Sequence, residues 1–251
     1  MSMSTLELVK LNKHYGKKHA LIEFSFTFTD GVYGLLGPNG AGKSTMLHLI
    51  TDNLRPDKDG GCVRWNGKPI AELGKEYRCQ LGFMPQQQEL YANMTAWDFL
   101  GYISALKCIP KKEAVQQIKQ TLEQVELSDV ADKQIGGFSG GMKQRILIAA
   151  AMLGDPALII MDEPTAGLDP KQRVMIRRLT QQLAQNKIII ISTHIVSDIE
   201  SIAKEIVLIK DGRLLTHGTV PELVQQVTDG EQTLENLYMQ YYGGDHADTS
   251  V

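Results

Sequence analysis

The chain has 251 residues, of which 43% are hydrophobic and 22% charged, as in an ordinary globular protein with a sizeable core. Its 26 basic and 29 acidic side chains give a formal net charge of −3. That balance provides no basic field for nucleic acid, so we predict no nucleic-acid partner. The cysteines, Cys62, Cys79 and Cys108, lie far apart and form no CxxC pair. They predict a reduced, cytoplasmic protein without a disulfide framework.

The first part of the chain predicts antiparallel strands that lead into a buried strand. Apolar residues alternate along Leu6–Leu8 and Phe24–Phe28, with one face buried. Val32–Leu36 is a short apolar run that ends at a glycine-rich loop, and Thr45–Asp52 has helical character. Cys62–Trp65 and the Asn66-Gly67 turn after it predict a hairpin.

The middle of the chain, about Glu89–Leu153, predicts an inserted group of helices. Apolar residues recur at helical spacing in Thr95–Leu106 and Lys111–Val125. Thr95 is a suitable N-cap for the first of these helices.

The last part alternates between predicted strands and helices. In order, the predicted elements are the strand Leu158–Met161, the helix Pro170–Asn186, the strand Ile188–Ser192, a short helix near Ser197–Ala203, a hairpin of Glu205–Lys210 and Arg213–His217, and closing helices at Val220–Val227 and Thr233–Tyr242. Short, wholly apolar strands that alternate with helices imply a parallel sheet covered on both faces. The polar tail Gly243–Val251 predicts a flexible end.

The segment Gly37-Pro38-Asn39-Gly40-Ala41-Gly42-Lys43-Ser44-Thr45 matches the phosphate-loop pattern G-x-x-x-x-G-K-[ST]. Its glycines let the backbone turn several N–H groups toward phosphate oxygens, and the following helix adds its positive end. The lysine of the pattern reaches the β- and γ-phosphates, and the hydroxyl after it is suited to hold Mg²⁺. The predicted ATP contacts are Gly37, Asn39, Gly40, Ala41, Gly42, Lys43, Ser44 and Thr45.

Two carboxylates, Asp162 and Glu163, follow the apolar strand Leu158–Met161. They stand at its carboxyl end, where ligands gather in parallel sheets. Asp162 is suited to a Mg²⁺ site, and Glu163 to a general base for the water that attacks the γ-phosphate. An exposed acidic loop after a core strand is the alternative, which the nearby phosphate loop disfavours.

Ser139-Gly140-Gly141 opens an apolar helix and predicts a second anion site. One chain needs only one site for a nucleotide. A second anion site therefore indicates a nucleotide site that is completed by another subunit. An ordinary helix N-cap is the alternative.

Together these motifs resemble, in order and spacing, the nucleotide-binding subunit of an ABC transporter, from about Leu6 to Tyr242. The resemblance implies an α/β fold: a P-loop NTPase core with a mainly parallel sheet, an N-terminal antiparallel β subdomain and an inserted helical subdomain. It implies a single ABC ATPase domain over residues 1–242. The catalytic core spans about 1–88 and 154–220, the helical insert about 89–153 and the C-terminal helices about 220–242.

Further site residues follow from this resemblance. Tyr15 is similar to the aromatic residue that stacks on adenine, although a core tyrosine at a strand end is the alternative. Gln86 resembles the glutamine that links Mg²⁺ and the attacking water to the membrane partner, an assignment that depends on the preceding Pro85. Asp169 resembles the aspartate of the dimer contact and is also suited to cap a helix. His194 resembles the histidine that contacts the γ-phosphate.

The resemblance also implies cofactors, partners and location. ATP and Mg²⁺ would lie between the phosphate loop of one subunit and Ser139–Gly141 of another, either itself or a related ATPase subunit. An integral membrane permease would contact Glu89–Met94, which places the chain at the inner face of the cell membrane. No apolar run reaches the roughly 18 residues that span a bilayer, so another chain would supply the membrane part. The motif variants are similar to those of the export-type bacterial subgroup with a separate permease.

Two positions depart from the commonest family pattern. Phe138 stands where leucine is usual and Met142 where glutamine is usual, but Ser139 and the two glycines are kept.

Two other interpretations of the chain's function stay open. A soluble ABC-type ATPase without a transport role is disfavoured by the lack of a long coiled-coil insertion, and an idle nucleotide sensor by the presence of Glu163 and His194.

Overall fold

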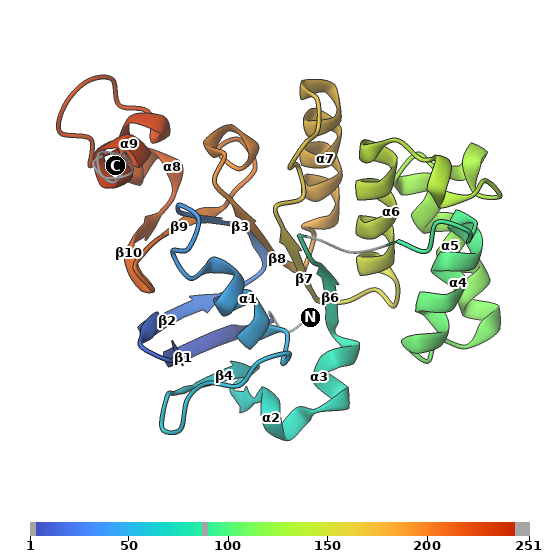
Figure 1. Ribbon diagram of the computed structural model, residues 1–251, viewed down its shortest axis with the longest axis horizontal. Coiled ribbons are helices and arrows are strands. Elements are labelled where there is room, and N and C mark those ends of the chain that lie inside the picture. Colours follow the sequence, from blue (N-terminus) through green and yellow to red (C-terminus); the bar gives the residue numbers. More distant parts are fainter. Residues whose placement is uncertain (1–3, 87–89, 244–251) are drawn as a thin grey trace.

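The computed structural model describes residues 4–86 and 90–243, which form two sheets with helices around them (Figure 1). The antiparallel sheet contains β1 (Leu6–Tyr15), β2 (Lys18–Phe28), β4 (Cys62–Trp65) and β5 (Lys68–Pro69), in the order β2-β1-β4-β5. The mixed sheet contains β3 (Gly31–Leu36), β6 (Leu81–Met84), β7 (Leu158–Asp162), β8 (Ile188–Thr193), β9 (Glu205–Lys210) and β10 (Arg213–Gly218), in the order β10-β9-β3-β8-β7-β6. The expected α/β fold with these two kinds of sheet is confirmed.

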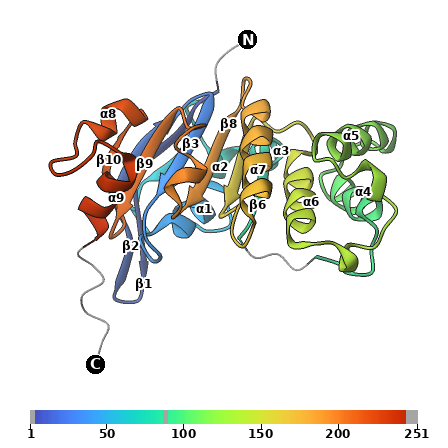
Figure 2. The same ribbon diagram turned by 90° about the horizontal axis from the view of Figure 1, so that it is seen from above.

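Helices cover the mixed sheet, and further helices lie beyond both of its ends (Figure 2). The α-helices are α1 (Lys43–Ile50), α2 (Ile70–Leu73), α3 (Lys75–Cys79), α4 (Ala96–Leu106), α5 (Lys111–Gln124), α6 (Gly140–Met152), α7 (Pro170–Leu183), α8 (Val220–Val224) and α9 (Leu234–Tyr242). Single 3₁₀ turns lie at Ser128–Val130, Ile135–Gly137 and Val196–Asp198. Figure 1 shows α4 and α5 at one end of the molecule and α8 and α9 at the other.

The β1–β2 pairing follows from the alternation in the sequence. Leu6 lies opposite Phe28 and Leu8 opposite Phe26, and all these side chains are buried. Burying one face fixes the register, because a slip of one residue would turn the apolar set outward. The predicted hairpin at Asn66-Gly67 is also present, since Trp65 pairs with Lys68.

The mixed sheet is apolar on both faces, as its wholly apolar strands predict. Along β7, Leu158 and Ile160 pack toward the antiparallel sheet and α1, whereas Ile159 and Met161 pack toward the opposite, helical layer. The strands β3, β6, β7, β8 and β9 run parallel, and β10 pairs antiparallel with β9. The carboxyl ends of these parallel strands therefore meet at one edge of the sheet, where ligands of such folds bind.

The helices α4, α5 and α6 pack against one another on one side of the sheet. Thr95 caps α4 as expected, because its hydroxyl accepts a hydrogen bond from Asp98 N at 3.0 Å. Helix α6 also packs on β6 and β7, so it belongs to the layer that covers the sheet as well as to the helical group. The proposed boundaries of the insert, about 89–153, stay a prediction.

The predicted short helix near Ser197–Ala203 is present only in part. Only Val196–Asp198 forms a 3₁₀ turn there. The chain must then reach β9 within a few residues, and Lys204 N donates to Val32 O at 2.7 Å to begin that alignment. Between the 3₁₀ turn and β9 the chain makes single helical turns, with Glu200 N donating to Val196 O at 3.1 Å and Ala203 N to Ile199 O at 2.8 Å.

Two other predicted helices end three residues early. Helix α7 ends at Leu183 instead of Asn186, because Asn186 adopts a left-handed conformation with φ 56°. Helix α8 ends at Val224 instead of Val227, because the following N–H groups turn back to carbonyls three residues earlier. The short elements α2, α3 and β6 were not predicted, since segments of four or five residues carry little periodicity.

Candidate active site

The phosphate loop connects β3 to α1 and has the backbone conformation that its glycines predict. Gly40 and Gly42 adopt φ values of 83° and 110°, which side chains with a Cβ rarely tolerate. A Cβ on Gly42 would lie 2.4 Å from Ala20 O, and one on Gly37 would lie 2.5 Å from Ile209 O. Both glycines are therefore required by close packing of the loop against neighbouring backbone.

Lys43 is the first residue of α1, and its side chain lies back over the loop. It is 7% exposed, and its ammonium donates to Gly37 O at 2.5 Å and to Pro38 O at 3.1 Å. Burial lowers the pKa of Lys43, while the charges of Glu163 and Asp162 oppose that shift. A buried cation held by carbonyls beside two carboxylates is placed to bind the phosphates of a nucleotide.

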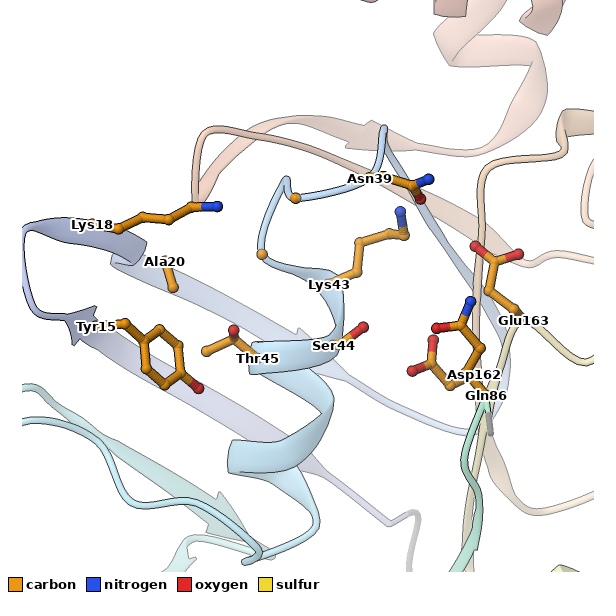
Figure 3. Close-up of a pocket in the computed structure, with 12 residues that line it drawn as sticks. Tyr15, Lys18, Ala20, Asn39, Lys43, Ser44, Thr45, Gln86, Asp162 and Glu163 are labelled. Atoms are coloured by element: carbon orange, nitrogen blue, oxygen red, sulfur yellow. The ribbon is translucent and has the colours of Figure 1, made fainter. Parts of the chain in front are cut away.

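A pocket opens beside this loop, and Figure 3 shows that its side chains come from both sheets. Tyr15 lies at one end of it, and Asp162 and Glu163 lie at the other. The lining residues are Tyr15, Lys18, Ala20, Asn39, Gly40, Gly42, Lys43, Ser44, Thr45, Gln86, Asp162 and Glu163. The aromatic end, the phosphate loop and the acidic end thus follow the order of base, phosphates and attacking water in a bound ATP.

Four predicted site segments follow the carboxyl ends of four parallel strands. Gly37 follows β3, Gln86 comes two residues after β6, Glu163 follows β7, and His194 follows β8. The parallel sheet therefore brings together residues that are far apart in the sequence.

Asp162 and Glu163 are both buried at the end of β7, with 6% and 4% of their surface exposed. The Ser192 hydroxyl of β8 donates a hydrogen bond to Asp162 Oδ1. Glu163 has a left-handed backbone, φ 51°, which is unusual for a residue with a Cβ and tends to occur at functional sites. Its N–H donates to Ser192 O at 3.0 Å and holds this conformation.

The two oxygens of the Glu163 carboxylate have different surroundings. Oε1 lies 3.0 Å from His194 Nδ1, while His194 itself is half exposed. Oε2 is buried, and no hydrogen-bond partner for it exists in the described part of the chain. A buried carboxylate oxygen needs a donor, and a water about to attack a phosphate is a donor of the required kind.

The residues predicted for Mg²⁺ fit that ion in their chemistry. Ser44, Gln86 and Asp162 supply a hydroxyl, an amide and a carboxylate oxygen, and all line the pocket. Within residues 4–86 and 90–243, no group of three or more His, Cys, Asp or Glu side chains could hold a metal. The single carboxylate of Asp162 beside a hydroxyl and an amide suits Mg²⁺, which binds proteins through one or two carboxylates and completes its shell with waters and substrate phosphates.

Tyr15 lies at the end of β1, and its side chain is 50% exposed at the mouth of the pocket. A tyrosine that only filled the core would be covered, so this exposure favours the stacking interpretation. Ala20 and Thr45 line the same end of the pocket and leave room beside the ring.

We expect Tyr15→Ala to raise the KM for ATP by roughly 5- to 150-fold with little change in kcat, because base stacking on an aromatic ring contributes about 1–3 kcal/mol. Steady-state ATPase measurements over a range of ATP concentrations check this. Tyr15→Trp keeps a flat ring and is the matched control, with a KM near that of the wild type. An unchanged KM in Tyr15→Ala would count against stacking.

Ser139, Gly140 and Gly141 do not line the pocket. Ser139 is the N-cap of α6, and its hydroxyl accepts a hydrogen bond from Met142 N at 3.3 Å. Ser139 and Gly140 are exposed and Gly141 is buried, and the first N–H groups of a helix have no partner within the helix. The alternative of an ordinary N-cap is therefore also realised in this chain.

The remaining predicted positions are partly described. Asp169 caps α7, since it accepts a hydrogen bond from Gln172 N at 2.9 Å, and it is exposed. Leu90–Met94 of the expected permease contact is described, whereas Glu89 lies outside the described residues, as do Gln87 and Gln88.

Several residues of the site were not predicted from the sequence. Lys18 and Ala20 line the pocket from β2, and Lys18 lies directly across the hairpin from Tyr15. The available signal was their position, three and five residues after the predicted aromatic residue Tyr15. Ser192, which bonds to Asp162, was treated only as the end of a buried strand.

The comparisons agree with this geometry. The family model of the ABC transporter matches residues 21–166, which is more than half of the chain. The chain belongs to the ABC transporter family. As an ABC ATPase, it binds ATP and hydrolyses it to ADP and phosphate, as the ATPase subunit of a transporter.

Curated relatives of this ABC ATPase are similar over most of its length. YxlF of Bacillus subtilis, an uncharacterized ABC transporter ATP-binding protein, is 35% identical over 88% of this chain and 73% of its own. The Nod factor export ATP-binding protein I of Burkholderia orbicola is 34% identical over 90% of this chain and 74% of its own. ABC transporter A family member 8 of Dictyostelium discoideum is 36% identical over 84% of this chain, but the match spans only 25% of that protein.

Solved structures of ABC ATPases share the fold. An ATP-binding subunit of an ABC transporter matches with a TM-score of 0.82 and 28% identity, over 94% of this chain and 98% of its own. The cbiO1 protein of Clostridium perfringens, part of the complex cbiONQ, matches with 0.79 and 26% identity over 88% and 90%. A dimeric post-hydrolysis ATP-binding cassette bound to ADP and Pi matches with 0.75 and 26% identity over 85% and 98%.

The ABC ATPase has no helix, among residues that the structure describes, that is long and apolar enough to cross a lipid bilayer.

Proposed function

We propose that this ABC ATPase drives an exporter by forming an ATP-dependent dimer of ATPase subunits on a separate membrane permease. The observation that carries the proposal is the split site. The pocket is lined by the phosphate loop, Lys43 and Glu163, whereas Ser139–Gly141 lies outside it, with Ser139 and Gly140 exposed and Gly141 buried. A solved relative is described as dimeric and bound to ADP and Pi, which supports a two-subunit site.

In the proposed dimer, each ATP lies between the phosphate loop of one subunit and Ser139–Gly141 of the other. ATP then contacts both subunits and favours the closed dimer by the difference in its affinity for the two states. The N–H groups that open α6 are suited to the γ-phosphate, since a helix start is an anion site. Hydrolysis removes that contact and lets the subunits separate.

The chemical step is assigned to three side chains. Glu163 accepts a proton from the attacking water through Oε2, while Oε1 stays paired with His194. Lys43 leaves its loop carbonyls for the phosphates and stabilises the charge there, as His194 does at the γ-phosphate. Ser44, Gln86 and Asp162 would hold Mg²⁺, which supplies charge neutralisation on the phosphate oxygens when bound.

An exposed aromatic pair supports contact with a membrane partner. Tyr91 and Tyr102 are 54% and 41% exposed, and their rings meet edge to face at a centroid distance of 5.7 Å. Leu106, one turn further along α4, is 62% exposed. Tyr91 lies within the predicted contact Glu89–Met94, close in sequence to Gln86. Exposed aromatic residues of this kind are enriched in protein interfaces.

The test is co-purification from membranes of the natural host. We expect the tagged chain to retain a multi-spanning permease in mild detergent. Tyr91→Asp with Tyr102→Asp should lower that recovery by at least about tenfold, because buried aromatic anchors dominate interface energies. Basal ATPase activity should remain, since neither ring lines the pocket.

Met239→Asp is the matched control for this test. Met239 is 60% exposed on α9, at the opposite end of the molecule from α4 (Figure 1). It should leave permease recovery unchanged. If the wild-type chain retains no multi-spanning protein, the transporter proposal fails. The direction of transport is tested separately, by measuring movement of a cargo out of vesicles that contain the recovered complex.

A further inference from the structure

A buried carboxylate outside the pocket, Asp198, joins the segments that carry the proposed catalytic residues. It ends the 3₁₀ turn Val196–Asp198, four residues after His194, and is 2% exposed. It is not among the pocket-lining residues. A charge buried this deeply is costly, and paired or hydrogen-bonded surroundings must compensate for it.

The strongest contact of Asp198 is with the loop that follows Glu163. Thr165 Oγ1 donates to Asp198 Oδ2 at 2.5 Å, and Thr165 is itself only 2% exposed. Thr165 is two residues from Glu163, and Asp198 is four residues from His194. This hydrogen bond therefore joins the loop after β7 to the segment after β8, the same two segments that the Glu163–His194 contact joins.

Two arginines of α7 extend the connection. Arg173 and Arg177 each lie 3.8 Å from one oxygen of Asp198. Arg173 Nε also donates to Leu168 O at 3.1 Å, beside Asp169, and Arg177 donates to Ser197 O at 3.0 Å. The Asp198 carboxylate thus contacts, directly or through Arg173, the segments that carry Glu163, His194 and Asp169.

The charge of Asp198 is poorly explained by packing alone. Its Oδ1 is buried and accepts no hydrogen bond from any residue that the structure describes, with Arg177 near it only as an ion pair. A neutral side chain of the same size would fill this place at a lower desolvation cost. A fully connected buried polar group can instead hold neighbouring segments in one arrangement.

We propose that Asp198 is a positioning residue, which fixes the loop of Glu163 against the loop of His194 and so sets their 3.0 Å contact. It acts through Thr165 and touches no nucleotide. This inference rests on the proposed catalytic roles of Glu163 and His194. Small displacements of a catalytic group are sufficient to slow a reaction without weakening substrate binding.

The test compares Asp198→Asn, Thr165→Val and Thr165→Ser by steady-state ATPase kinetics. We expect the first two to lower kcat by roughly 10- to 100-fold. The KM for ATP should change by less than about threefold, since the pocket itself is untouched. Thr165→Ser keeps the hydroxyl and should restore kcat to near the wild-type value. The double variant should be no slower than Asp198→Asn alone, because both changes remove one interaction.

Thr180→Val is the matched control for a merely structural effect. Thr180 is a buried threonine of α7 whose hydroxyl donates to Ile176 O of its own helix at 2.9 Å. It should leave kcat and KM unchanged, whatever its effect on Tm. If Asp198→Asn does not fold, Thr165→Val against Thr165→Ser decides the question, because these variants keep the carboxylate.

Two results would overturn the proposal. One is a folded Asp198→Asn or Thr165→Val with wild-type kcat, and the other is a multiplicative loss in the double variant. Glu163→Gln is assayed in the same series. If Glu163→Gln itself turns over normally, the proposed catalytic function fails, and that outcome is separate from failure of the Asp198 inference.

Discussion

Glu163→Gln should lower kcat for ATP hydrolysis by about 100-fold or more while ATP still binds, because removing a general base costs on the order of 10² to 10⁴ in rate. The amide keeps the shape of the side chain at Oε1, where His194 lies 3.0 Å away. It cannot accept a proton at the buried, unpartnered Oε2. Release of phosphate from ATP with Mg²⁺ measures the rate, and fluorescence of a labelled ATP measures binding.

The structure offers a matched control for this substitution. Glu205 and His217 form a second glutamate–histidine pair, with 3.4 Å between Oε2 and Nδ1, away from the pocket. Glu205→Gln should retain the wild-type rate. The stalled Glu163→Gln protein should also accumulate as an ATP-bound dimer, visible by size-exclusion chromatography. Wild-type turnover in Glu163→Gln would contradict the role proposed for Glu163.

Lys43→Ala is expected to abolish both tight ATP binding and turnover, with a loss in kcat of about 100-fold or more. The ammonium is the buried cation of the pocket, held at the loop carbonyls of Gly37 and Pro38. Without it, negative charge that develops on the phosphates has no such fixed partner. Titration with the labelled ATP and a phosphate-release assay measure the two losses.

Lys17→Ala controls for the loss of one positive charge. Lys17 is exposed in the turn between β1 and β2 and does not line the pocket. It should behave as the wild type. Near-normal ATP affinity in Lys43→Ala would mean that the loop does not bind phosphate as proposed.

The pocket could be predicted from sequence because its parts follow short apolar strands. Gly37, Glu163 and His194 each come directly after one of these strands, and a parallel sheet brings the ends of its strands together. The glycines of the phosphate loop also predicted its backbone conformation correctly, because close backbone packing at Gly42 permits no side chain. Local pattern and global fold agree at these positions.

The parts that could not be predicted depend on contacts between distant segments. Thr165 and Asp198 are 33 positions apart, and neither stands in a pattern that indicates a hydrogen bond to the other. The predicted helix near Ser197–Ala203 is reduced to a 3₁₀ turn and single helical turns where the chain crosses to β9. Tertiary geometry, which periodicity does not encode, decides both cases.

In the proposed dimer, each ATP site has two halves: the phosphate loop of one chain and Ser139–Gly141 of the other. Two variants can each destroy one of these halves. In a head-to-tail dimer, Lys43→Ala damages the phosphate loop of its own chain. Ser139→Glu damages the half-site that its chain offers to the partner, because the added carboxylate opposes the γ-phosphate. Each variant alone then leaves no intact site.

The most direct test of the composite site is therefore to mix these two variants and measure ATPase activity. Half of the dimers in an equal mixture combine both chains, and each such dimer has one intact site of two. The account predicts recovery to about a quarter of wild-type turnover, if each site of the symmetric dimer works alone. Activity in the mixture no greater than that of the separate variants would contradict it.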